Sequence, residues 1–233
     1  MILNNIHSPI FVTGVERSGS SIIARIISLC GAFTGLTTEM YENIEVKKLL
    51  DTYYELIGAD KKGQRPLPDT KKLLILNNWK QKIEDVIIGG KYHRESPWML
   101  KGSRLCQTWP LWYYAFPNAK WVIVRRRTGD IIDSCLKTGY MTAYKDREGW
   151  LEWEHAHEKL FVDMIETGVN CKIVWPERMV TGDYQQIFEM VDWLGLCWNN
   201  RVMSVVDPLL WNSKQRDKTK GAYNGKQNNG SRS

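Results

Sequence analysis

The sequence predicts an α/β protein in which a parallel β-sheet is flanked by helices. Short apolar runs rich in β-branched residues alternate along the chain with longer segments whose apolar residues recur at helical spacing. Strands that are separated by helices pair in parallel through crossover connections, so this order favours a sheet with helices on its faces. The chain has 233 residues, 43% of them hydrophobic, which is enough to bury the core of one domain.

The first half of the chain begins with a predicted strand and a predicted helix. Residues 9–13 (PIFVT) form a compact apolar run that Gly14 stops, which is typical of a buried strand. Isoleucines at helical spacing follow, and Gly31 is a suitable C-terminal stop for their helix. The further elements expected here are helices at 40–57 and 71–88, a loop with two prolines at 58–69, a strand at 98–100 and a helix at 105–116.

The second half repeats the order of strand, turn and helix. Residues 119–124 (AKWVIV) form the clearest strand, and three arginines separate it from a helix with an apolar face at 131–136. The elements expected after it are an amphipathic helix at 150–164, a strand at 172–175 and a helix that Asp183 caps and Gly195 closes. Ligands of parallel α/β sheets bind beyond the carboxyl ends of the strands, where segments 14–21 and 125–130 are expected to lie.

The positive charge of the chain is concentrated at its C-terminal end. The formal net charge is +6, and residues 212–233 hold six basic residues and one acid, so the rest of the chain is nearly neutral. We therefore expect a single domain over residues 1–211 and a basic, flexible tail over residues 212–233. A nearly neutral body without zinc-finger spacing or an aromatic RNA-binding signature disfavours nucleic acid as a partner.

Membrane and secretory signals are not evident in the sequence. No apolar run approaches the roughly 18 residues that a membrane span needs, and residues 1–8 lack the basic start and apolar centre of a secretory signal. We expect no membrane partner and a cytoplasmic location. The five cysteines are odd in number and form no Cys-x-x-Cys pair, which predicts reduced, mostly buried thiols and no zinc site.

Residues 14–21 (GVERSGSS) lie between the first predicted strand and the first predicted helix. Their spacing is that of the phosphate-binding P-loop, G-x-x-x-x-G-K-[ST], but Ser20 stands where that loop has its lysine, and Arg17 supplies a cation instead. Backbone N–H groups at the start of a helix attract anions, so this segment predicts an anion cradle. The missing lysine argues against ATP or GTP hydrolysis. The alternative is a glycine-rich turn that binds no ligand.

A second anion motif follows the strand at 119–124. Residues 126–134 (RRTGDIIDS) put Arg126 at the end of that strand and Ser134 on the next helix. A guanidinium binds a phosphate bidentately, and a serine hydroxyl donates a further hydrogen bond. For Arg125 and Arg127, ligand contact and a solvated or ion-paired position stay equally open.

Together the two segments resemble the motifs of the sulfotransferases that use 3′-phosphoadenylyl sulfate (PAPS). That family's 5′-phosphosulfate loop is G-x-x-[RK]-[SA]-G-[TS]-[ST], and its 3′-phosphate motif is R-x-P-x-D-x-x-x-S after a strand, from which this chain lacks only the proline. Weaker similarities lie at 98–101, 116–120, 175–180, 193–196 and 220–226, and the resemblance spans residues 9–198. It implies a P-loop-like nucleotide-binding sulfotransferase fold.

The resemblance implies a metal-independent enzyme that transfers the sulfuryl group of PAPS to a hydroxyl or amine of an acceptor. The product from the donor is adenosine 3′,5′-bisphosphate (PAP), and Arg17 and Lys101 stabilise the charge that develops during transfer. The donor-binding residues that it implies are Glu16, Arg17, Ser18, Gly19, Ser20, Ser21, Arg126 and Ser134. The acceptor stays open among small molecules, carbohydrates and peptides, and so does the oligomeric state.

A hydroxyl acceptor needs a general base. Ser103 stands where the cytosolic sulfotransferases have their histidine. The segment GLTTE that ends at Glu39 resembles the GEETR of the tyrosylprotein sulfotransferases, which implies Glu39 as the base, with Glu42 in reserve. The alternative is that Glu39 lies in the first turn of a helix, where the helix dipole favours a carboxylate. His157, on an apolar helical face, is expected to be structural.

Two other functions compete with sulfuryl transfer. The first is a P-loop kinase-like, ATP-dependent phosphotransferase, which predicts ATP binding and Mg²⁺ dependence despite Ser20. The second is a non-catalytic module that binds a nucleotide or a polyanion through the arginines and the tail. It predicts salt-sensitive association with polyanions and no transfer.

Overall fold

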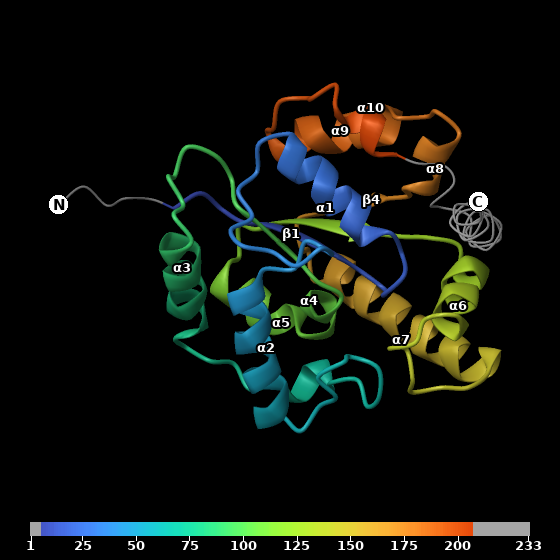
Figure 1. The fold of residues 1–233 in the computed structure, drawn as a ribbon. Helices are drawn as coiled ribbons and strands as arrows, with labels where there is room; N and C mark the ends of the chain where they lie inside the picture. The colour runs from blue at the N-terminus through green and yellow to red at the C-terminus, as the bar shows by residue number, and fades with distance from the viewer. Residues whose placement is uncertain (1–5, 207–233) are drawn as a thin grey trace, which may run out of the picture.

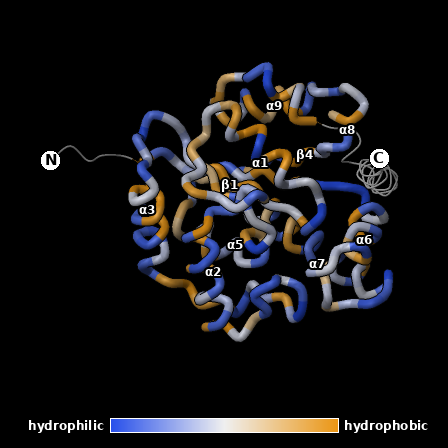
Figure 2. Tube along the Cα trace, in the orientation of Figure 1, coloured by the Kyte–Doolittle hydropathy of each residue, from blue (hydrophilic) through white to orange (hydrophobic). Residues whose placement is uncertain are grey.

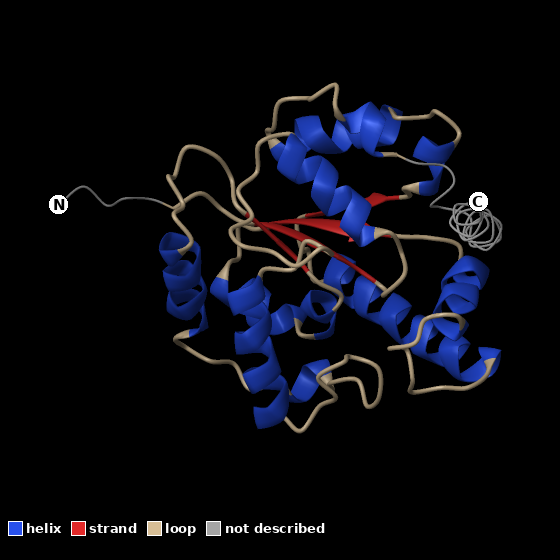
Figure 3. Ribbon diagram, in the orientation of Figure 1, coloured by secondary structure: helices blue, strands red, loops and turns tan. Residues whose placement is uncertain are grey.

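A four-stranded parallel β-sheet lies at the centre of the molecule, and helices cover both of its faces (Figures 1 and 3). The computed structural model describes residues 6–206. The strands lie in the order β2-β1-β3-β4 and have the bounds Ile10–Gly14 (β1), Met99–Lys101 (β2), Lys120–Val124 (β3) and Cys171–Val174 (β4). Each predicted strand is confirmed to within one residue, and so is the predicted α/β fold class.

The helices form two layers. Figure 1 shows α1, α8, α9 and α10 on one side of the sheet and α2, α3, α5 and α7 on the other. The helix bounds are Ser20–Leu29 (α1), Ile44–Leu56 (α2), Trp79–Gly89 (α3), Arg104–Gln107 (α4), Trp109–Ala115 (α5), Thr128–Leu136 (α6), Arg147–Glu166 (α7), Glu177–Val180 (α8), Gln185–Leu194 (α9) and Val202–Val205 (α10), with one 3₁₀ turn, Thr70–Lys72 (η1). Among residues 6–206, no helix is both long and apolar enough to cross a membrane.

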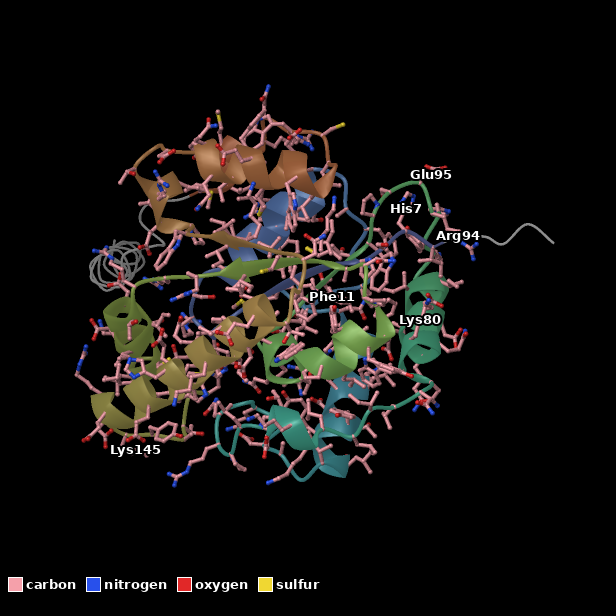
Figure 4. The ribbon with its side chains drawn as sticks, turned by 180° about the vertical axis from the view of Figure 1, so that it is seen from behind. His7, Phe11, Lys80, Arg94, Glu95 and Lys145 are labelled. Carbon is pink, nitrogen blue, oxygen red and sulfur yellow. The ribbon has the colours of Figure 1, made fainter. Side chains whose placement is uncertain are left out.

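The core consists of two layers because successive strand residues point to opposite faces of the sheet. Phe11 and Trp121 face α2–α7, whereas Ile10, Val12 and Val122 face α1 and α9. Phe11 lies in the middle of the molecule (Figure 4), and the rings of Trp98, Trp112, Phe116 and Trp121 meet it edge-on at centroid distances of 4.8–6.3 Å. The hydropathy colours agree, since orange segments gather along the sheet (Figure 2).

Two predicted helix starts are wrong. Helix α2 begins at Ile44 and not at residue 40, because the Asn43 side chain accepts a hydrogen bond from the Val46 N–H and caps the helix. Helix α3 begins at Trp79 and not at residue 71. In the intervening segment, Asp69 caps η1 and the Leu74 carbonyl accepts a hydrogen bond from the Tyr53 hydroxyl, so these backbone groups find partners outside an α-helix.

The predicted cap of α9 is displaced by one residue. The N-cap position is Tyr184, and the Asp183 carboxylate accepts a hydrogen bond from the backbone N–H of Gln185. Gly195 closes this helix in the left-handed conformation, with φ 76°, as the sequence predicts. The short helices α8 and α10 were not predicted, because four residues are too few to show a helical period.

The cysteine side chains agree with the sequence prediction. All five cysteines are free, and Cys30, Cys106 and Cys135 are buried, so reduced and mostly buried thiols are confirmed. The predicted basic tail at 212–233 and the similarity at 220–226 lie outside the described residues.

Strands β1 and β3 are direct neighbours, and this brings their carboxyl ends together. The register pairs Gly14 with Val124, so the segments that follow these residues leave the sheet side by side. A Cβ atom at Gly14 would overlap the Val124 carbonyl oxygen, so only glycine fits this close approach. The sheet therefore sets the two predicted anion motifs next to each other.

Candidate functional site

The segment between β1 and α1 forms a tight loop. Arg17 and Gly19 have positive φ angles of 72° and 95°, and the Ser18 N–H donates to the Val15 carbonyl over 3.0 Å. Helix α1 then begins with no side-chain cap and with no acidic residue in its first turn. The positive end of this helix is thus not offset by a side-chain cap or by an acidic residue of its first turn.

Ser18 is the most enclosed residue of this loop. Its side chain is fully buried, and its Oγ has no hydrogen-bond partner among the described residues. A buried hydroxyl without a partner costs about 1–3 kcal/mol, so such atoms are rare unless a ligand satisfies them. The Oγ would lie only 2.7 Å from a Cβ at Gly14, which is a second reason for glycine there.

Arg17 connects the loop to α6. Its Nε donates to the Ser134 Oγ over 2.8 Å, and its Nη1 lies 3.5 Å from the Tyr140 hydroxyl. Within residues 6–206, Arg17 forms no ion pair with a carboxylate. Its charge is therefore available to an anion, and the two predicted anion motifs meet through a direct hydrogen bond.

Arg126 is the arginine of its motif that faces the loop. Its Nη1 donates to the Arg17 carbonyl over 3.1 Å. Burial lowers the pKa of the Arg126 guanidinium, and the carboxylates of Asp130 and Glu177 act in the opposite direction. Arg126 and Ser134, both expected at the donor site, thus each contact Arg17.

The two flanking arginines occupy other positions. Arg125 forms an ion pair with Glu158, and its guanidinium lies over the rings of Phe161 and Trp175 at 5.9 and 5.3 Å. The Arg127 side chain is 76% exposed and lies 3.4 Å from Asp130. Of the two alternatives that the sequence left open for Arg125 and Arg127, both residues therefore show the ion-paired one.

Lys101 lies at the carboxyl end of β2, beside the loop. Its side chain is buried, and its Nζ forms a 3.0 Å ion pair with Glu42 Oε1. Burial alone would raise the pKa of Glu42, but Lys101, together with the more weakly acting Lys47 and Arg104, outweighs burial and holds this pKa below its ordinary value. The reserve carboxylate Glu42 thus belongs to the site.

The Glu16 carboxylate lies beside Ser103, in the turn that follows β2. Its Oε1 accepts a 3.3 Å hydrogen bond from the Ser103 Oγ. Burial and the neighbouring Glu42 raise the pKa of Glu16 to about 7, although Lys101, Ser103 and Arg17 act to lower it. The sequence assigned Glu16 to the donor loop and did not identify these neighbours.

Glu39, the first candidate base, lies in an exposed turn ahead of α2. No hydrogen bond or ion pair connects its side chain to another of residues 6–206. Because α2 begins at Ile44, the alternative interpretation of Glu39 as a first-turn helix residue is wrong.

His157 lies in the core of the molecule. His157 is fully buried between the Gln107 side chain at 2.9 Å and the Trp153 carbonyl at 2.8 Å, and burial lowers its pKa to about 4. These contacts agree with the structural role predicted for His157. Four tryptophans whose rings could in principle stack on a ligand are buried as well: Trp109, Trp112, Trp150 and Trp153.

Comparison with known proteins relates this fold to solved structures. No protein-family model and no curated protein matches the chain. The chain is similar to the sulfotransferase domain of the olefin synthase of Synechococcus PCC 7002, at 15% identity and a TM-score of 0.57, over 93% of this chain and 88% of that one. It is also similar to sulfotransferase STF9 of Mycobacterium avium, at 11% identity and a TM-score of 0.53, over 93% of this chain and 69% of that one. At these identities, the likeness establishes the fold.

Proposed function

Because this chain has the sulfotransferase fold, we propose that it transfers the sulfuryl group of PAPS to a hydroxyl or amine of an acceptor molecule. The observation that supports this most strongly is the 2.8 Å hydrogen bond between Arg17 and Ser134, which joins the 5′-phosphosulfate motif to the 3′-phosphate motif. A donor with both groups needs two anion sites close together. The acceptor is a small molecule, a carbohydrate or a peptide.

The residues around the loop suit such a donor. The start of α1, the Arg17 guanidinium and the unpartnered Ser18 hydroxyl would bind the phosphosulfate end. Arg126 and Ser134 would bind the 3′-phosphate. Gly14 keeps the space beside Ser18 free of a side chain. The groups that would contact the ligand all donate hydrogen bonds, as a ligand with several anionic oxygens requires.

The transfer itself needs electrostatic stabilisation. The acceptor oxygen or nitrogen attacks sulfur, while the bond between sulfur and the phosphate oxygen breaks and negative charge collects on the departing phosphate. Arg17 has no carboxylate partner in residues 6–206, so its charge can stabilise this negative charge. Lys101 lies beside the loop and would assist, with Glu42 holding its ammonium group in place.

Calorimetric titration tests the proposal. The purified protein is titrated with PAP without metal, and in parallel with adenosine 5′-monophosphate and with ATP and Mg²⁺. Micromolar binding that needs the 3′-phosphate is the expected result. Binding of ATP with Mg²⁺ but not of PAP would favour the kinase-like alternative, and no binding of any of the three would favour the non-catalytic module.

A further inference from the structure

One carboxylate oxygen of Glu16 has no role in the proposed donor site. Oε1 accepts from Ser103, whereas Oε2 is enclosed and has no hydrogen-bond partner among residues 6–206. A carboxylate can accept about four hydrogen bonds, so an enclosed and unpaired oxygen is costly in the ionised state. An ionised phosphate has no hydrogen to donate to this ionised oxygen. The hydroxyl group of the molecule that receives the sulfuryl group does have one.

The groups that face Glu16 come from four parts of the chain. Glu42 precedes α2, Lys101 ends β2, and Cys135 and Tyr140 belong to α6 and the loop after it, while Arg17 is its neighbour in the loop. Lys101 is already paired with Glu42 at 3.0 Å. Glu16 therefore has no ion-pair partner of its own in the described part of the chain, and burial with Glu42 raises its pKa to about 7.

We propose that Glu16 is the general base of the transfer, accepting the acceptor's proton on Oε2, an inference that rests on the proposed function. In this step, the acceptor oxygen forms a bond to sulfur, and its hydrogen moves to Glu16. The bond between sulfur and the 5′-phosphate oxygen breaks, and PAP leaves with that electron pair. Glu16 then returns the proton to solvent. Its position next to Arg17 puts the base and the charge-stabilising cation on one loop.

The other carboxylates suit this step less well. Glu42 is held in an ion pair by Lys101, and its lowered pKa makes it a weak base. Glu39 lies in an exposed turn and forms no hydrogen bond or ion pair with the loop within residues 6–206. A base with a pKa near the working pH combines the correct protonation state with sufficient basicity, and Glu16 meets this condition at neutral pH.

The test compares Glu16→Gln with the wild type and with Glu152→Gln, a matched control on the exposed side of α7. The release of PAP from PAPS is followed between pH 5.5 and 8.5, first with water as acceptor and then with added 2-naphthol. Glu16→Gln is expected to lower the rate by at least ~100-fold. It is also expected to abolish the rise of the rate through about pH 7, whereas its affinity for PAP stays unchanged.

Several outcomes would overturn the assignment. A Glu16→Gln variant that keeps the rate and its pH step excludes Glu16 as the base, as does a step that disappears in Glu39→Gln or Glu42→Gln instead. If neither acceptor is turned over, infrared titration decides: a carboxyl group that titrates near pH 7 and is missing from Glu16→Gln supports the assignment, and its absence refutes it. A wild type that fails to bind PAP contradicts the proposed function itself.

Discussion

Replacement of Arg17 by alanine tests the residue on which the proposed chemistry depends most. The side chain donates to Ser134 over 2.8 Å and has no carboxylate partner within residues 6–206. Its backbone already has a φ of 72°, and alanine meets the same strain there, so the fold should tolerate the change. The matched variant Arg17→Lys keeps the charge but loses the guanidinium that reaches Ser134.

The size of the effect follows from these contacts. Removal of one preorganised donor to a developing negative charge costs about 2.7–4 kcal/mol, or ~100- to 1,000-fold in kcat. The affinity for PAP should fall less, by ~10-fold, because only ground-state hydrogen bonds are lost. Arg17→Lys should lie between the wild type and Arg17→Ala, because it retains the cation without the planar geometry.

The assay measures the release of PAP from PAPS, together with calorimetric PAP binding and thermal unfolding of each variant. An unchanged melting temperature with a large loss of turnover is the expected result. Turnover of Arg17→Ala at the wild-type rate would remove Arg17 from the transfer. A joint loss of turnover and melting temperature would show that the arginine stabilises the fold and would refute the electrostatic argument.

Three further predictions concern the ligand site, the sheet and the core. Arg126→Ala should weaken PAP binding by ~10- to 100-fold in calorimetry, because a charge-assisted contact to the ligand is lost. The control Arg127→Ala changes an exposed side chain and should bind PAP as the wild type does, so equal affinities of all three proteins would contradict the role of Arg126. Gly14→Ala should lower the free energy of unfolding by about 1–3 kcal/mol in a denaturant titration, because the new Cβ overlaps the Val124 carbonyl; wild-type stability would refute the argument. Burial lowers the pKa of His157 to about 4, so the unfolded chain binds this proton between pH 6.5 and 4 while the folded chain does not. The wild type should therefore lose about 3 kcal/mol of stability over that interval relative to His157→Asn, and parallel pH profiles of the two proteins would show the reasoning to be wrong.

The parts that could be predicted from the sequence are those with local signals. The strands at 9–13 and 119–124 and the motifs that follow them lie in short contiguous segments, and the neighbouring positions of β1 and β3 then bring Arg17 to Ser134. Helix starts were less predictable. The segment before Trp79 has helical periodicity, yet its backbone groups bond to Asp69 and Tyr53.

The contacts around Glu16 could not be predicted from sequence spacing. Glu16 and Ser103 are 87 positions apart, Lys101 and Glu42 are 59 apart, and Arg17 and Tyr140 are 123 apart. No periodic pattern connects such pairs, because the packing of whole elements decides which polar side chains meet. The burial that raises the pKa of Glu16 is likewise a property of the folded chain.

The hydrogen bonds between the two anion motifs make them a single cooperative unit. Arg17 of the first motif donates to Ser134 of the second, and Arg126 of the second donates back to the backbone of the first. A ligand group that orders one motif is therefore expected to order the other, with the same coupling in both directions. For the proposed donor, the two ends of the nucleotide would be recognised together, and a change in either motif is expected to alter the affinity for both ends.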